Sequence, residues 1–125
     1  MLYNTDAQTI AAGGTLTLPA NSINSTGSIT ASGTTGVTLA PGQYLVTFVS
    51  DANVAAAGTL GAALEFGGAA LPYAVTAETQ DAAGADRITL TAIVTPTTAQ
   101  PLTVINSSGS SNTYTNSTLT IVKLA

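Results

Sequence analysis

The sequence has 125 residues, a length typical of one domain, and only 6% of them are charged, against about 25% in an average soluble protein. It contains no Cys and no His, which excludes the usual zinc and haem sites, disulfides, a Cys nucleophile and a Ser-His-Asp triad. Two basic residues against six acidic ones argue against nucleic acid or anionic lipid as partners. We therefore expect one domain over residues 1–125, without catalysis, metal or cofactor. No apolar run is long enough to span a membrane, and no signal peptide is visible.

Threonine residues alternate with Val, Ile and Leu along much of the chain, which indicates half-buried strands. The alternative, a disordered low-complexity segment, rests on the abundance of Ala, Thr, Gly and Ser alone. The pattern predicts an all-β fold, a two-sheet antiparallel jelly-roll sandwich of about ten short strands. In chain order, the expected strand segments are 2–5, 8–10, 15–18, 28–30, 37–39, 44–49, 60–66, 71–79, 87–95, 102–106 and 117–124.

Glycine and proline predict where several of these strands end. Pro41-Gly42 and Gly67-Gly68 are typical of tight turns, because Pro presets φ and Gly permits positive φ. Pro72 lies near the start of its segment and predicts an edge strand, where a missing backbone donor is tolerated.

Some strands are expected to bury one face and others both. In the segment 60–66, the large side chains alternate with Gly61, Ala63 and Glu65, which predicts one solvent face. In the segment 44–49, by contrast, Tyr44, Val46 and Phe48 form one apolar face, and Leu45, Thr47 and Val49 form a second that is largely apolar. The segments 88–94 and 118–124 have the same two-sided character.

A two-layer sandwich has one interior, so apolar second faces require another partner. Leaving such a patch in water is unusual for a monomer, and a chain with so few charges has little to prevent its aggregation. We therefore expect a homo-oligomer whose interface is the second face of these three strands. The alternative is a monomer with scattered exposed aliphatic residues, which are common on protein surfaces.

Three segments resemble the C1q/TNF-like jelly-roll family. Pro41-Gly42-Gln43-Tyr44-Leu45-Val46 resembles its PGxYxh signature, 84–88 resembles its Gly-Asp-x-(Val/Ile) segment before strand F, and 117–124 resembles its closing strand H. In order and spacing, the whole chain looks like the bacterial branch, the BclA-type head domains of collagen-like surface glycoproteins. No Gly-X-Y stretch precedes Met1, which departs from that pattern.

The resemblance implies a homotrimer in which strands A, A′, H, C and F form the sheet that lines the threefold contact. Carried over by position, it places Tyr44, Val46, Phe48, Leu119 and Ile121 in the core. The residues that it assigns to the trimer interface are Leu45, Thr47, Val49, Thr91, Ile93, Thr120, Val122 and Leu124.

The function that the resemblance implies is structural, a head that trimerises a collagen-like protein on the exosporium or cell surface of a bacterium. The alternative is a trimeric recognition tip that binds a host glycan or protein, as in lectins or phage fibres. The predicted loops are mostly Ala, Gly, Ser and Thr, which favours the structural interpretation, because a binding tip is expected to gather aromatic and acidic side chains.

Several acidic residues are candidates for a binding or catalytic site. Glu78, Asp81 and Asp86 surround one predicted loop and could bind Ca²⁺ through their oxygens, but their spacing matches no calcium loop, and they are expected to solvate a turn. Glu65 and Glu78 could act as a glycosidase pair only if they faced each other across a cleft, and nothing in the sequence places them together.

The remaining polar candidates have simpler interpretations. Asp86-Arg87 is expected to be a local charge pair, and Lys123 a solvated charge that blunts a strand end. Tyr73 and Tyr114 are expected near loops, where they could stack on sugars. The Asn-x-Ser/Thr patterns at 24–26, 106–108 and 116–118 are expected by chance in a chain so rich in Ser and Thr.

Overall fold

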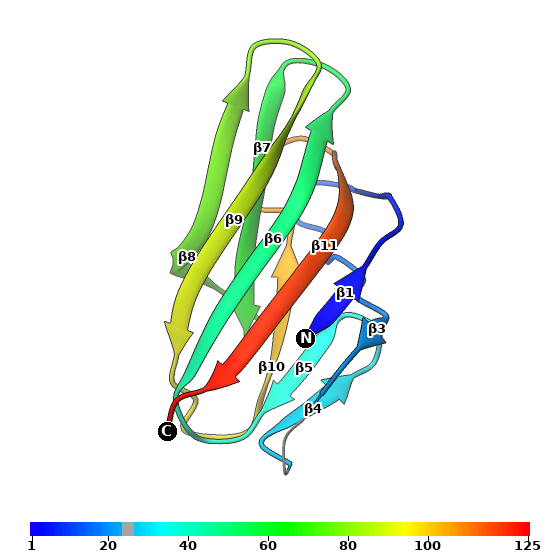
Figure 1. Ribbon diagram of the computed structural model, residues 1–125. Coiled ribbons are helices and arrows are strands. Elements are labelled where there is room, and N and C mark those ends of the chain that lie inside the picture. Colours follow the sequence, from blue (N-terminus) through cyan, green and yellow to red (C-terminus); the bar gives the residue numbers. More distant parts are fainter. Residues whose placement is uncertain (24–26) are drawn as a thin grey trace.

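The computed structural model (Figure 1) describes residues 1–23 and 27–125, which form eleven strands and no helix. The strands are β1 (Leu2–Asn4), β2 (Gln8–Ile10), β3 (Ala20–Asn21), β4 (Ile29–Ser32), β5 (Gly36–Leu39), β6 (Tyr44–Val54), β7 (Gly58–Phe66), β8 (Ala69–Gln80), β9 (Gly84–Val94), β10 (Gln100–Ile105) and β11 (Asn112–Lys123).

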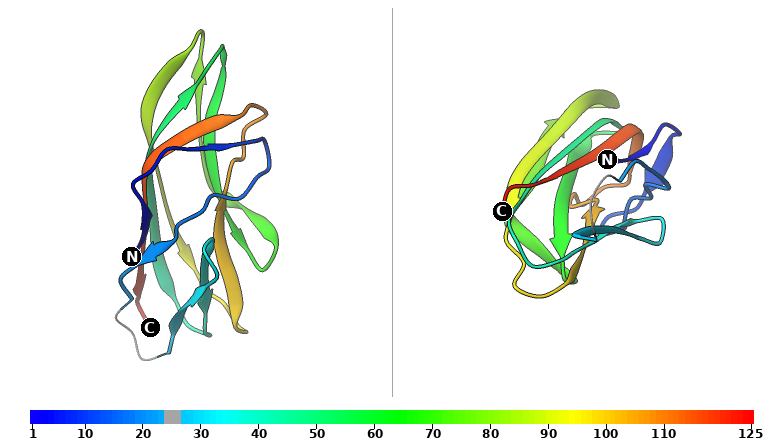
Figure 2. Two further views of the ribbon diagram at one scale, coloured as in Figure 1. Left: turned by 90° about the vertical axis from the view of Figure 1, so that its right-hand side faces the viewer. Right: turned by 60° about the horizontal axis from the view of Figure 1, so that its bottom comes forward.

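The strands form two antiparallel sheets packed face to face in a jelly-roll sandwich, which confirms the predicted fold class (Figures 1 and 2). The front sheet, which faces the viewer in Figure 1, has the order β3-β1-β11-β6-β9, and β2 also pairs with β11. The back sheet has the order β4-β5-β10-β7-β8. We call the end with the β6–β7 and β8–β9 turns the distal end and the end with the β5–β6 turn the proximal end; the chain ends at the proximal end.

One hydrophobic cluster fills the space between the sheets. It takes alternate residues from the long strands, since successive side chains of a strand point to opposite faces. Tyr44, Val46 and Phe48 of β6 and Leu119 of β11 are fully buried, and Ile121 packs against the cluster. The five core positions predicted for these two strands are therefore confirmed.

The prediction of one solvent face for β7 is wrong at its centre, where Gly61 and Ala63 are buried as completely as their inward neighbours. A Cβ at Gly61 would lie only 3.1 Å from Ser107 Oγ and 3.4 Å from Ser108 Cβ, so the loop after β10 covers this part of the strand. Ala63 lies in register between Val75 of β8 and Ile105 of β10. The chain covers its own surface here, and only very small residues fit beneath the cover.

Two side chains of β11 complete the back sheet where a strand is missing. β10 pairs with β7 only over 63–66. Further along β7, the Asn112 amide accepts from Gly61 N (3.0 Å) and donates to Thr59 O (3.0 Å), and the Tyr114 hydroxyl donates to Gly61 O. These contacts satisfy backbone groups that would otherwise be buried without partners.

The segment 15–18 is not a strand, contrary to the prediction, although Leu16 and Leu18 are buried as its alternation suggests. Its backbone bonds go to three separate partners, because Leu16 N donates to Val104 O, Thr17 N to Gln8 Oε1, and Leu18 N to Thr34 O. The alternation correctly predicted which side chains face the core, but no neighbouring strand offers a continuous ladder.

Strand ends also differ from the predictions. β6 continues to Val54 and β11 begins at Asn112, because each provides the other with a partner along nearly its whole length, interrupted by a bulge between Thr115 and Thr118. Asn116 occupies this bulge with a φ of 54°, a conformation that Asn tolerates better than most residues. The Gly67-Gly68 turn and the edge position of β8, which carries Pro72, are confirmed.

Candidate interaction surface

Seven of the eight residues predicted for an interface lie on the outer face of the front sheet, opposite the core, and the eighth, Leu124, directly follows the end of β11. Leu45 is in register with Ile93 on one side and Val122 on the other, and Thr47 is in register with Thr91 and Thr120. Val49 follows on the same face of β6, and Leu124 comes two residues after Val122. The sequence therefore identified one continuous face, formed by the neighbouring strands β9, β6 and β11.

The face changes character along the strands. Near the proximal end it has a row of aliphatic side chains, Ile93, Leu45 and Val122, and next to it a row made only of threonine. Towards the distal end lies a row with an ion pair, in which Arg87 Nε is 3.2 Å from Asp51 Oδ1.

This face, together with the residue that follows β11, holds three of the six most exposed large apolar side chains among the described residues: Ile93 at 49%, Val122 at 50% and Leu124 at 48%. On the central strand β6, the outward side chains are Leu45, Thr47 and Val49. They are half-buried, and so less exposed than those three, because β9 and β11 flank β6 on both sides. The described residues thus leave an aliphatic patch in contact with solvent, which is uncommon on monomers.

The predicted interface includes no residue of β1, although β1 pairs with β11 and extends this face. Tyr3 is in register with Thr118 and is half-buried. Its position on the outer face follows from the alternation with Leu2, which is buried. That alternation was present in the sequence, but three residues are too short a pattern to assign a face.

The ion pair was predicted with the wrong partner. Asp86 and Arg87 are consecutive residues within β9, so their side chains point to opposite faces. The Asp86 carboxylate accepts a hydrogen bond from the backbone N–H of Arg87 (2.7 Å), whereas the Arg87 side chain binds Asp51 on β6. Both side chains of that pair are largely exposed, so it contributes little to stability by itself.

Of the three acidic residues considered for calcium, the structure brings only two together. Glu78 is in register with buried Leu60 and Asp86 with buried Ala52, so both carboxyls point between the sheets at the open distal end. The pKa of Glu78 is raised, first because it hydrogen-bonds to Asp86 and then by charge repulsion from the same group. Among the described residues, no three His, Cys, Asp or Glu side chains form a metal cluster.

Glu65 and Glu78, which the sequence does not place together, do not share a cleft. Glu78 points inward from β8, whereas Glu65 follows the buried Leu64 and therefore points outward from β7. The two carboxyls lie on opposite faces of the back sheet.

The tyrosines separate into buried and exposed residues. Tyr44 is buried, as predicted, but the prediction for Tyr114 is wrong, because this side chain is fully buried and hydrogen-bonded to Gly61 O. Burial raises the pKa of the Tyr114 phenol. Tyr73 on edge strand β8 is 62% exposed and is the tyrosine available to stack on a ligand.

The three Asn-x-Ser/Thr patterns have different surroundings. Asn106 is fully buried and its amide donates to Ile10 O and Ser110 O, so this amide is not accessible for modification. Asn116 is exposed in the β11 bulge, and Asn24 lies outside the described residues.

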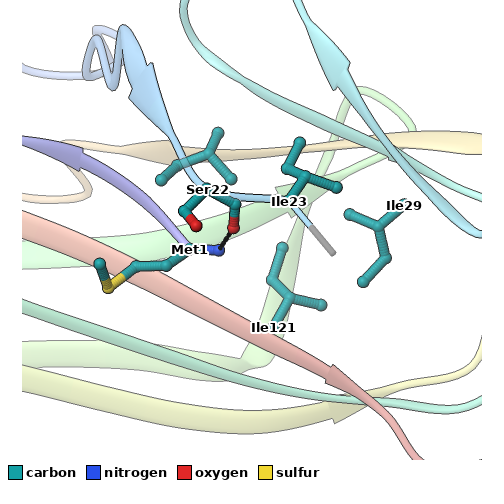
Figure 3. A pocket seen from close by; sticks show the side chains of 6 residues that line it. Met1, Ser22, Ile23, Ile29 and Ile121 are labelled. Carbon is teal, nitrogen blue, oxygen red and sulfur yellow. Dashed lines mark hydrogen bonds between the residues drawn. The ribbon is translucent and has the colours of Figure 1, made fainter. Parts of the chain in front are cut away.

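A small cavity of about 190 Å³ lies near the N-terminus, between β1, β4 and β11 (Figure 3). Its lining is mainly aliphatic, and the Met1 ammonium donates to Ser22 O (2.8 Å) at its rim.

Lys123 lies at the end of β11, as predicted for a charge at a strand end, and its Nζ donates to Ser28 Oγ (3.1 Å).

Comparison with models of known protein families and with the curated proteins gives no match. In the part of the chain that the structure describes, there is no helix of the length and apolar character needed to cross a membrane.

Proposed function

We propose that the chain is a self-associating structural head, and that its outer front-sheet face packs against further copies of the same chain. The observation that carries this proposal is the continuous aliphatic row Ile93, Leu45 and Val122, whose two outer members are about half exposed, beside a row of threonines. Covering each half-exposed aliphatic side chain contributes about 1 kcal/mol, and a closed assembly repeats this gain at each interface.

The proposed number of copies is three, as the resemblance to C1q/TNF-like heads implies. The neighbouring strands β1, β11, β6 and β9 support this, because they have the positions that strands A, H, C and F have in the sheet lining the family's threefold contact. A trimeric head would hold three chains in register for an elongated protein on a bacterial spore or cell surface, or on a phage particle.

Light scattering coupled to size exclusion tests the proposal directly. We expect a molar mass three times that of the chain, with concentration-dependent dissociation on dilution. A monomer at high micromolar concentration would overturn the proposal.

A second candidate function, a trimeric tip that binds glycans, is favoured by one observation. Tyr73 presents an exposed aromatic side chain on β8, and its neighbours Pro72 and Val75 are also exposed. A glycan array probed with the protein and with Tyr73→Ala distinguishes the functions. Binding that Tyr73→Ala abolishes supports the tip, and the absence of binding over a varied set of glycans argues against its lectin form.

A further inference from the structure

Symmetry limits how copies of this chain can meet in the proposed trimer. A twofold dimer joins the same patch on both copies, whereas a ring of three joins two different patches of adjacent copies. In a ring whose axis runs along the strands, one lateral margin of each front sheet lies beside the opposite lateral margin of the next. These margins are β9 on one side and the β1–β2 link on the other.

The register places one charged residue of each margin at the same level. Arg87 on β9 is in register with Asp51 on β6, which is in register with Thr115 on β11. On the other side of β11, Asn4 is in register with Ser117 and Gln8 with Tyr114. Asp6 lies midway between Asn4 and Gln8, and is therefore level with the Arg87 row.

β3 does not shield Asp6 from a neighbouring copy. It pairs only with Leu2 and Tyr3, closer to the proximal end. At the level of Asp6, the segment 15–18 lies beside the β1–β2 link, because Thr17 is hydrogen-bonded to the side chains of Asn4 and Gln8. Asp6, which lies between those two residues, is nevertheless exposed.

The two side chains have complementary charges and free capacity. The bond to Asp51 uses one of the five N–H donors of the Arg87 guanidinium, and 66% of this side chain is exposed. Asp6 is exposed, and the only hydrogen bond found for it, Asp6 N to Asn4 Oδ1, leaves its carboxylate free.

The other charges at this level are less suitable partners. Glu78, Asp81 and Asp86 belong to the β8–β9 hairpin, on the same margin as Arg87, so an adjacent copy in the ring does not bring them to Arg87. Lys123 lies at the proximal end and is bonded to Ser28, far along the strand from Asp6.

We propose that the Arg87 guanidinium of each copy binds the Asp6 carboxylate of the next copy, while it retains its bond to Asp51. This inference rests on the proposed self-association and adds a residue-level contact that fixes which margins meet. Three such pairs would also fix the positions of the copies along the axis. Contacts between aliphatic rows are not directional and do this poorly.

Charge reversal tests the pair. Because each chain has a net charge of −4, adding positive charge alone should strengthen association, so a weaker association points to the loss of a specific pair. Asp6→Arg lowers the overall repulsion between copies, yet it should weaken trimerisation by roughly 10–100-fold, because three exposed pairs are lost at once. Asp81→Arg changes the net charge equally and serves as the matched control. It should leave trimerisation unchanged or slightly stronger.

The double variant Asp6→Arg with Arg87→Asp should restore most of the association that either single variant loses. Sedimentation equilibrium measures the unaltered protein, the two single variants, the Asp81→Arg control and the double variant. If the unaltered protein is a monomer, the proposed self-association is overturned and the pair with it. If it is a trimer but Asp6→Arg has no effect, or the double variant fails to recover, only the Arg87–Asp6 pair is overturned.

Cross-linking provides a readout that does not depend on affinity, since the chain has no cysteine of its own. A flexible bis-maleimide reagent, applied to the double variant Asp6→Cys with Arg87→Cys, should give covalent trimers and no larger species. Each single-cysteine variant should remain uncross-linked. Covalent dimers from a single-cysteine variant would indicate that like margins meet and would overturn the pairing.

Discussion

The outer faces of the two sheets differ in the size of their residues and in how far the chain covers them. On the back sheet, the centre of β7 is buried on both faces and its outward residues are small: the loop that follows β10 covers Gly61, and Ala63 lies between β8 and β10. On the front sheet, the corresponding positions of β6, β9 and β11 carry Leu45, Ile93 and Val122, and two of these three are about half exposed. Where the chain covers its own sheet, the covered residues are small; where the outward residues are large and aliphatic, no described part of the chain covers them.

The largest effect is expected when the same charge is placed on the outer face of each sheet in turn. Val122 on the front sheet and Val75 on the back sheet are exposed to nearly the same extent, 50% and 48%. Val122→Asp should abolish trimerisation, because it buries three unpaired carboxylates in the proposed interface, whereas Val75→Asp should leave the trimer intact. Light scattering on both variants measures the difference; equal behaviour would mean that the front face has no special role.

The next largest effect is expected within the back sheet, where Asn112 replaces a missing strand. Asn112→Ala removes the partners of Gly61 N and Thr59 O and should lower the free energy of unfolding by about 2–3 kcal/mol. Tyr114→Phe removes one hydrogen bond to Gly61 O and should cost about 1 kcal/mol. Urea denaturation checks both values, and a smaller effect for Asn112→Ala than for Tyr114→Phe would contradict this assignment.

A third prediction tests the cover over β7 itself. Gly61→Val would force side-chain atoms against Ser107 and Ser108 and should destabilise the fold by about 1–3 kcal/mol. Ala77 is in register with Gly61 on β8 but is exposed, so Ala77→Val should change stability by no more than about 0.5 kcal/mol. Thermal unfolding of the two variants, side by side, shows whether the loop really closes this face.

The smallest expected effect concerns pH and the open distal end between the sheets. Asp86 raises the pKa of Glu78, so the folded protein holds this proton to a higher pH than the unfolded chain does. This contribution to stability is therefore complete below the ordinary carboxyl pKa and is lost as pH rises through the raised value. Glu78→Gln should flatten the dependence of Tm on pH in that range, whereas Glu65→Gln, on the outer face of β7, should not.

Strand positions and inward faces could be predicted from the sequence because alternation is a local property. The alternation identified the core residues of β6 and β11. It also predicted correctly that Leu16 and Leu18 face the core, although no strand forms there. Strand ends were missed because the partner strand decides them, as it does where β6 extends to Val54. The alternating apolar pattern ends at Val49, yet β9 pairs with β6 as far as Val54.

The polar contacts were harder to predict because their partners are distant in the chain. Arg87 passes over its neighbour Asp86 to bind Asp51, 36 residues away, and Tyr114 reaches Gly61 across 53 residues. The Tyr114 position looked like a loop in a run of Ser, Asn and Thr. No local pattern shows that this hydroxyl completes a sheet, since the need for it arises from a gap in another strand.

The pairing of β1 with β11 has a consequence for how the chain acquires its structure during synthesis. Leu2 is in register with Leu119, so until nearly the whole chain has emerged, the first strand can pair only with the two-residue strand β3. The Thr59–Gly61 part of β7 likewise waits for Asn112 and Tyr114. Contacts between such distant residues slow folding and leave strand edges open in the meantime. We therefore expect truncation by even the last dozen residues to produce aggregates rather than a smaller folded core.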